Sequence, residues 1–177
     1  SAVKFGIMKL FHFHHFFYSG VQRFSPNTEV VIAEGGTIRL GRHVRAHRRS
    51  KLLAMDGGTL EIGSNTALGN GVSVNCMESI VIGEGVQIGP DTKIYDHDHD
   101  YRVPGGIGAG KFVTAPVTIG DNSWIGCNVV ILRGTSIGKN CIVGAGSVLK
   151  GTYPDNSVIV QKRQTTATVY PLERTEK

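Results

Sequence analysis

Cysteine is scarce in this sequence and long apolar runs are missing, and each absence excludes a class of protein. The chain has three cysteines in 177 residues, Cys76, Cys127 and Cys141, and none are close enough in sequence to indicate a disulfide framework or a zinc ribbon. No apolar run approaches the roughly 20 residues of a membrane-spanning helix. The start of the chain also lacks the pattern of a secretory signal peptide. We therefore expect a cytoplasmic protein.

The first residues, SAVKFGIMKLFHFHHFFYSG, combine many aromatic side chains with lysine and histidine. We interpret this segment as a short cap that covers one end of the hydrophobic core. An anchor on a membrane surface is the alternative, and it would place the protein at the inner face of the membrane through peripheral contact of its N-terminus.

Positive charge dominates, with a formal net charge of +5 and a pI of about 9.2, which favours anionic partners. The run RLGRHVRAHRRSK, residues 39–51, holds six Arg or Lys and two His. It is either a solvated face or a dock for an anionic acceptor, such as a sugar on a lipid phosphate, or for an acidic membrane. No nucleic acid partner is expected, because the basic run is not accompanied by a recognition helix or by aromatic residues on which bases could stack.

Glycine, by contrast, is abundant, and its 24 copies recur with a period of six. Each repeat begins with Ile, Leu or Val, has Gly, Asn or Asp at the fourth place, and has a small or β-branched residue at the fifth. Gly, Asn and Asp tolerate a left-handed backbone, so the fourth place is predicted to be a corner. The nine fourth-place residues are Asn65, Gly71, Gly85, Asp91, Asn122, Asn128, Gly134, Asn140 and Gly146.

Three six-residue sides make a triangular coil, and such coils stack their short strands in parallel. The repeat therefore predicts an all-β protein, a parallel β-helix over residues 31–160, with an extension over 1–30 and a tail over 161–177. Between Ile82 and Ile119 the repeat is interrupted, which indicates either two coils or one coil with an excursion loop over 95–118.

The repeats, together with IGPDTKIYDHDHDYR and PVTIGDNSWIGCNVVILRGTSIGKNCIVGAGSVL, resemble the hexapeptide-repeat acyltransferases over roughly residues 35–160. The resemblance implies a left-handed helix, whereas crossovers between parallel strands are usually right-handed. It also implies a homotrimer that uses acetyl-CoA as co-substrate. The YDHDH version is most similar to enzymes that O-acetylate the sugars of capsular polysaccharides or exopolysaccharides, which implies a sugar acceptor.

The resemblance places the catalytic histidine five residues after Ile94, at His99, with His97 as its neighbour. Imidazole suits the removal of a proton from a hydroxyl that attacks a thioester directly. In an extended strand the two histidines share one face, while the three aspartates of the motif lie on the other. The group that orients His99 is therefore expected elsewhere.

Two other functions remain open from the sequence. A metal-dependent hydratase, like the related β-helix carbonic anhydrases, would need histidines from different coils. His43 and His47 are expected about 10 Å away from the motif, which disfavours a zinc site. The second alternative is a non-catalytic β-helix that serves as a binding or assembly module, in which the motif is only a polar strand end.

The resemblance also places the pantetheine arm of CoA along the C-terminal coils. Trp124 and Cys127 are expected to point outward there, whereas Cys141 at a fifth place is expected in the core. Relatives differ from this chain around residues 150–152 and 161–164. The candidate cofactor-binding residues are Trp124, Cys127, Ala145 and Gly146, with Lys150, Lys162 and Arg163 as candidates for the nucleotide phosphates.

Overall fold

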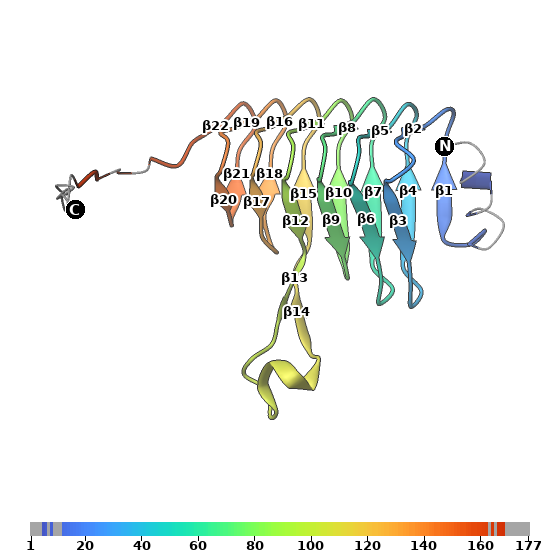
Figure 1. Cartoon of the computed structure of the whole chain (residues 1–177), viewed down its shortest axis with the longest axis horizontal. Coiled ribbons are helices and arrows are strands. Elements are labelled where there is room, and N and C mark those ends of the chain that lie inside the picture. Colours follow the sequence, from blue (N-terminus) through green and yellow to red (C-terminus); the bar gives the residue numbers. More distant parts are fainter. Residues whose placement is uncertain (1–4, 7, 9–11, 163, 165, 169–177) are drawn as a thin grey trace, which may run out of the picture.

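The computed structural model describes residues 5–6, 8, 12–162, 164 and 166–168, and its strands form three parallel sheets around one core (Figure 1). The A sheet contains β1 (Phe16–Tyr18), β4 (Thr37–Leu40), β7 (Thr59–Ile62), β10 (Ser79–Ile82), β15 (Val117–Ile119), β18 (Ser136–Ile137) and β21 (Thr152–Tyr153). The B sheet contains β2 (Arg23–Phe24), β5 (Arg45–Ala46), β8 (Ala67–Leu68), β11 (Gln87–Ile88), β16 (Trp124–Ile125), β19 (Ile142–Val143) and β22 (Val158–Ile159). The C sheet contains β3 (Glu29–Ile32), β6 (Lys51–Ala54), β9 (Ser73–Cys76), β12 (Lys93–Tyr95), β17 (Val130–Ile131) and β20 (Val148–Leu149).

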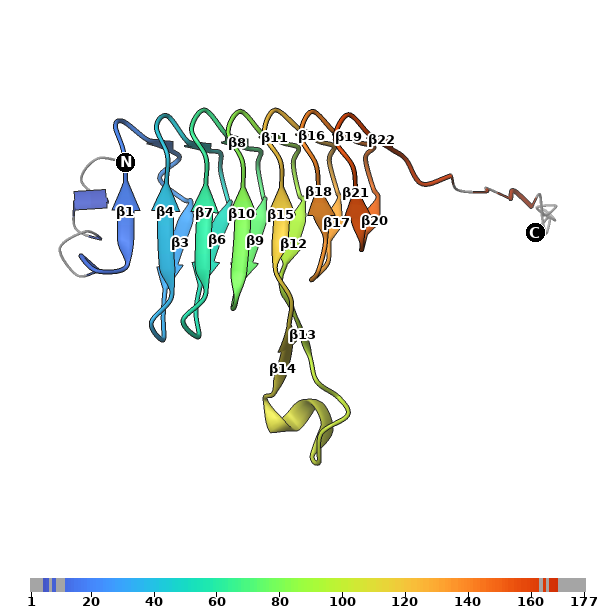
Figure 2. The same cartoon turned by 180° about the vertical axis from the view of Figure 1, so that it is seen from behind.

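The chain visits the three sheets in the order A, B, C in every coil, which makes a triangular prism. In Figure 2 the A strands run upward in front, the chain crosses the top through the B sheet, and it returns behind through the C sheet while it advances from left to right. This winding is left-handed. The predicted left-handed parallel β-helix is confirmed.

The corners between the sheets have the predicted backbone. All nine fourth-place residues of the repeats have positive φ values, between 54° at Asn128 and 75° at Gly134. In the earlier coils, other residues adopt this conformation. Examples are Glu34 (φ 50°) in the first coil and His43 (φ 57°) and Arg49 (φ 59°) in the second. The left-handed corner thus belongs to every coil, whereas the Gly, Asn and Asp signal belongs only to the regular repeats.

The first and fifth places of the repeat fill the interior, as predicted. The first-place Ile, Leu and Val side chains are buried along the whole prism. At the fifth place, buried hydroxyls tie a coil to the next one, because Thr66 Oγ1 donates to the Gly83 carbonyl (2.8 Å) and Ser123 Oγ donates to the Gly138 carbonyl (3.0 Å). A small hydroxyl can therefore occupy the core without an unsatisfied polar atom.

The β-helix begins earlier than the expected residue 31. Strand β1 pairs with β4, and β2 and β3 pair with β5 and β6, so residues 16–30 form a coil of the prism and not an extension. This coil lacks the regular repeat, which is why its sequence does not reveal it. The open end of this coil is covered by Phe5, which is buried and whose ring packs on Phe16 and Phe24.

The interruption after Ile82 is one coil with an excursion. Strand β10 pairs directly with β15, in register from Ile80 with Val117, so no further coil intervenes. The excursion ends before β15, which includes residues 117–118 of the expected loop. Among the described residues, no helix is long and apolar enough to cross a membrane.

Candidate active site

The excursion leaves the prism at the corner between the C and A sheets and projects away from it (Figure 1). Its two strands, β13 (His97–His99) and β14 (Phe112–Thr114), pair antiparallel, with His97 opposite Thr114 and His99 opposite Phe112. A short 3-10 helix (Gly106–Ala109) lies at its far end. The YDHDH motif therefore forms the root of a hairpin at this corner.

Asp96, between β12 and β13, turns into the protein and is fully buried. Its carboxylate accepts hydrogen bonds from the backbone N–H groups of Met77, Glu78 and Ser79, at 2.8 to 3.1 Å. These three groups belong to the turn between β9 and β10, at the same corner of the preceding coil. Asp96 therefore fastens the root of the hairpin to that coil.

The environment of Asp96 keeps it ionised. Burial alone would raise the pKa of its carboxyl, but the hydrogen bonds from His97 and from the Glu78 and Met77 backbone outweigh burial and lower this pKa below its ordinary value. The neighbouring Cys76 responds in the opposite direction, since burial and the negative charge of Asp96 raise the pKa of its thiol. Cys76 is thus a neutral core residue.

His97 is held by this carboxylate, with Nδ1 2.9 Å from Asp96 Oδ1. Because an ionised carboxylate can only accept, Nδ1 carries the hydrogen, and Nε2 is left as the accepting nitrogen of the neutral ring. The His97 side chain is 15% exposed. It is the more buried of the two histidines of the motif.

His99 lies on the same side of the hairpin but is exposed. Its ring lies 4.5 Å from the ring of Phe112, and the His97 ring lies 5.6 Å from the same ring. The two imidazoles therefore share one face, as the sequence predicts. The sequence did not predict that Asp96 orients His97. Alternation along a strand does not show that the chain leaves the strand at Asp96, between β12 and β13.

The next aspartate fastens the hairpin on its other side. Asp98 Oδ2 lies 2.6 Å from Nε of Arg133, which occupies the same C–A corner in the following coil. Asp96 and Asp98 thus tie the hairpin to the coils before and after it. Arg133 was not among the residues expected at the site, although its position in the repeat ILRGTS is visible in the sequence.

Three of the candidate cofactor residues lie at a different corner, and a fourth lies beside it. Cys127 follows β16 at the B–C corner, and Ala145 and Gly146 occupy this corner in the next coil, where the Gly146 N–H donates to the Cys127 carbonyl (2.8 Å). Trp124 lies on the adjoining B strand with 56% of its surface exposed. Cys127 is exposed, and Cys141 is buried, as predicted.

Within one chain, the hairpin and this B–C corner lie at opposite ends of the C strands. The six residue steps from Cys127 to Arg133 span at most about 20 Å. Lys150 continues the register of the C strands at the C–A corner, two coils beyond Tyr95, or roughly 10 Å from it at ordinary strand spacing. Lys162 is exposed beyond the last strand, and Arg163 lies outside the described residues.

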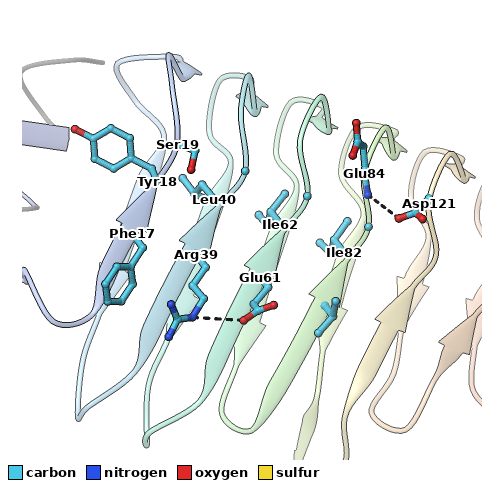
Figure 3. A pocket seen from close by; sticks show the side chains of 14 residues that line it. Phe17, Tyr18, Ser19, Arg39, Leu40, Glu61, Ile62, Ile82, Glu84 and Asp121 are labelled. Carbon is cyan, nitrogen blue, oxygen red and sulfur yellow. Dashed lines mark hydrogen bonds and ion pairs between the residues drawn. The ribbon is translucent and has the colours of Figure 1, made fainter.

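Other concave surfaces lie away from the hairpin. Figure 3 shows a groove of about 600 Å³ across the outer face of the A sheet, lined by Phe17, Arg39 and Glu61 among others. Here the Arg39 guanidinium lies over the Phe17 ring and pairs with Glu61 at 3.4 Å. In the part of the chain that the structure describes, no three His, Cys, Asp or Glu side chains are grouped so that they could hold a metal ion.

Comparisons with known proteins agree with this fold. Residues 116–151 match the family model described as bacterial transferase hexapeptide (six repeats). The putative lipopolysaccharide biosynthesis O-acetyl transferase WbbJ of Escherichia coli K12 is 30% identical over 138 residues, which cover 72% of this chain and 69% of that protein. The chain belongs to the hexapeptide-repeat transferase family.

Two further relatives extend the comparison for this hexapeptide-repeat transferase. A probable acetyltransferase of Mycobacterium tuberculosis is 34% identical over 126 residues, which cover 70% of this chain but only 41% of that protein. The crystal structure of a hexapeptide-repeat acetyltransferase from Vibrio cholerae, in complex with acetyl coenzyme A, has a TM-score of 0.56 and 25% identity over 90% of this chain and 72% of that one.

Proposed function

We propose that this protein is an acetyl-CoA-dependent O-acetyltransferase that acts on a hydroxyl group of a saccharide. Family membership supports acetyl transfer, and the name of the Escherichia coli relative supports a saccharide as acceptor. The acetyl coenzyme A in the Vibrio cholerae structure supports the donor. The observation that carries the proposal is the pair of imidazoles on one face of the hairpin, of which His97 is held in place by Asp96.

In the proposed reaction His99 is the general base. Its exposed ring can meet an acceptor hydroxyl that arrives from solvent, and it takes the hydroxyl proton as the oxygen attacks the thioester carbonyl. The tetrahedral intermediate then expels the CoA thiolate, which recovers a proton. The acetyl ester and free CoA are the products, and no covalent enzyme intermediate is needed.

His97 has a different role in this proposal. Because Asp96 fixes its ring and its tautomer, the free Nε2 offers a positioned acceptor beside His99. We assign His97 to the orientation of the acceptor hydroxyl or of the His99 ring. Asp96 acts through His97 and is a positioning residue.

We further propose that the complete site forms between copies of the chain in a homotrimer. Cys127, Ala145 and Gly146 line one corner of the prism beside Trp124, and the hairpin histidines lie at another corner. A donor bound along the first corner would meet the histidines of a neighbouring chain more directly than those of its own. The three unpaired cysteines favour a reducing compartment such as the cytoplasm for this reaction.

The test is release of free thiol from acetyl-CoA in the presence of a panel of sugars. We expect His99→Ala to lower kcat by about 100-fold to 10,000-fold, while His14→Ala, an exposed histidine far from the hairpin, leaves it unchanged. Chelator should have no effect. A His97→Ala protein that loses all activity beside a fully active His99→Ala protein would reverse the two roles, and metal-dependent activity would overturn the proposed chemistry.

A further inference from the structure

Over the first three coils, one side of the prism has basic side chains and no acidic ones. Across the B sheet and its two corners, the first three coils comprise residues 19–28, 41–50 and 63–72, and these contain no Asp or Glu. The basic face of these coils consists of Arg23, Arg42, His43, Arg45, His47, Arg48 and Arg49, all of them exposed. In the part of the chain that the structure describes, none of these seven side chains makes an ion pair with a carboxylate.

Two arginines stand directly opposite each other at the centre of the basic face. Arg23 on β2 is in register with Arg45 on β5, on strands that are about 4.8 Å apart. Like charges in directly opposite positions destabilise a sheet. The next residue in this row is the small Ala67, which leaves space beside the pair.

Hollows flank the arginine pair on both sides. One has a volume of about 330 Å³ and is lined by Arg23, His43, Arg45 and Asn65. The other has a volume of about 270 Å³ and is lined by both arginines with His47. These volumes lie near the lower limit of small-molecule sites, so each hollow suits a compact polar group.

The backbone of the same coil supports a functional reason for these side chains. His43 and Arg49 occupy left-handed corners at φ values of 57° and 59°. All nine regular repeats use Gly, Asn or Asp at this place, because other residues adopt the conformation at a cost. This coil therefore has basic side chains at two positions where the fold favours Gly, Asn or Asp.

We propose that the Arg23–Arg45 pair and its two flanking hollows bind the phosphate groups of an anionic ligand. A bound phosphate would relieve the repulsion between the two guanidinium groups, and the planar fork of each guanidinium matches two phosphate oxygens. His43 and His47 would supply further donors from the adjoining corners. Within one chain the site lies across the prism from the hairpin corner, and it is on the same B sheet as Trp124, which is three strands further along the row from Arg45. Its test measures phosphate binding and does not depend on the proposed acetyl transfer.

The ligand's phosphate can come from a soluble diphosphate or from a lipid headgroup, and two measurements on the full-length chain separate these sources. Calorimetry with sodium pyrophosphate tests the first. Flotation with vesicles of phosphatidylcholine, with and without about 30 mol% phosphatidylglycerol, tests the second. The decisive protein is the double variant Arg23→Gln/Arg45→Gln. Its matched control is Arg39→Gln/Lys139→Gln, which removes two cations from outside the basic face.

We expect the double variant to bind pyrophosphate or anionic vesicles at least about tenfold more weakly than the natural protein, and the control to change binding by less than about twofold. Binding of pyrophosphate identifies a soluble ligand, and binding of anionic vesicles alone identifies a membrane surface. Thermal unfolding without ligand should show that the double variant is folded, because both side chains are exposed. Equal losses in the two double variants, or no binding of either probe by the natural protein, would overturn the proposal.

Discussion

The carboxylate of Asp96 lies 2.9 Å from Nδ1 of His97 and is buried beneath the root of the hairpin. The same carboxylate accepts hydrogen bonds from three backbone N–H groups of the preceding coil. One residue thus connects the fold of the prism with the orientation of an imidazole at the candidate active site. Substitutions of Asp96 should affect both stability and catalysis.

Replacement of Asp96 by Asn should lower the free energy of unfolding at neutral pH by about 2–3 kcal/mol. The amide has a single accepting oxygen, and its NH₂ group would face backbone donors, so buried N–H groups would lose their partner. Urea unfolding followed by circular dichroism measures the change. Asp98→Asn is the matched control and should cost about 1 kcal/mol or less, because the ion pair of Asp98 with Arg133 is partly exposed. Equal losses in the two variants would contradict a special role for the buried carboxylate.

The contribution of Asp96 should also depend on pH in a defined direction. Its pKa is lower in the folded protein than in the unfolded chain, so the unfolded chain binds more protons in acid. The stabilisation is therefore fully present above the unfolded pKa of about 3.9, and it is lost as the pH falls through the folded pKa. The free energies of unfolding of the natural protein and of Asp96→Asn, measured from about pH 7 down to about pH 2, should differ less and less as the pH falls below about 4. A constant difference would show that the carboxylate is not the responsible group.

The corners of this fold could be predicted from sequence because they depend on local backbone chemistry. Each left-handed position in the regular repeats carries Gly, Asn or Asp, and all nine have positive φ. Local signals fail in the first coils, where corners such as Glu34 and His43 adopt the same conformation without a favourable residue. There the stacking of each coil on its neighbour determines the backbone, and this stacking is invisible in a short stretch of sequence.

The candidate site was predictable in part. The shared face of His97 and His99 follows from alternation along a strand, and the resemblance of the motif to a known family identified both residues. The partner of His97 was not predictable, because Asp96 contacts a turn 17 to 19 residues earlier in the chain. Such a contact depends on which corners lie side by side in stacked coils. To predict it, the number of residues in each coil must be known.

Replacement of Phe5 by Ala tests the interpretation of the N-terminus as a cap. Phe5 is 2% exposed and packs on the rings of Phe16, Tyr18 and Phe24, so its loss should lower the free energy of unfolding by about 3 kcal/mol. Phe13→Ala is the control, since Phe13 is 62% exposed and should change stability by less than about 0.5 kcal/mol. If Phe5→Ala is as stable as the natural protein but loses binding to vesicles, the membrane-anchor alternative is favoured.

The second place of the repeat should exclude a side chain at Gly120. A Cβ atom on Gly120 would lie 2.5 Å from the carbonyl carbon of Gly138 in the next coil, because the coils stack without room for a side chain there. Gly120→Ala should therefore force two coils apart and lower the free energy of unfolding by about 1–3 kcal/mol. Gly108→Ala in the 3-10 helix of the hairpin is the control, since a Cβ there would have no other atom within 4 Å. Thermal unfolding of the two variants should separate them clearly. A Gly120→Ala protein as stable as Gly108→Ala would mean that the coils can move apart without loss, and the close stacking that positions Asp96 beneath the hairpin would then need another explanation.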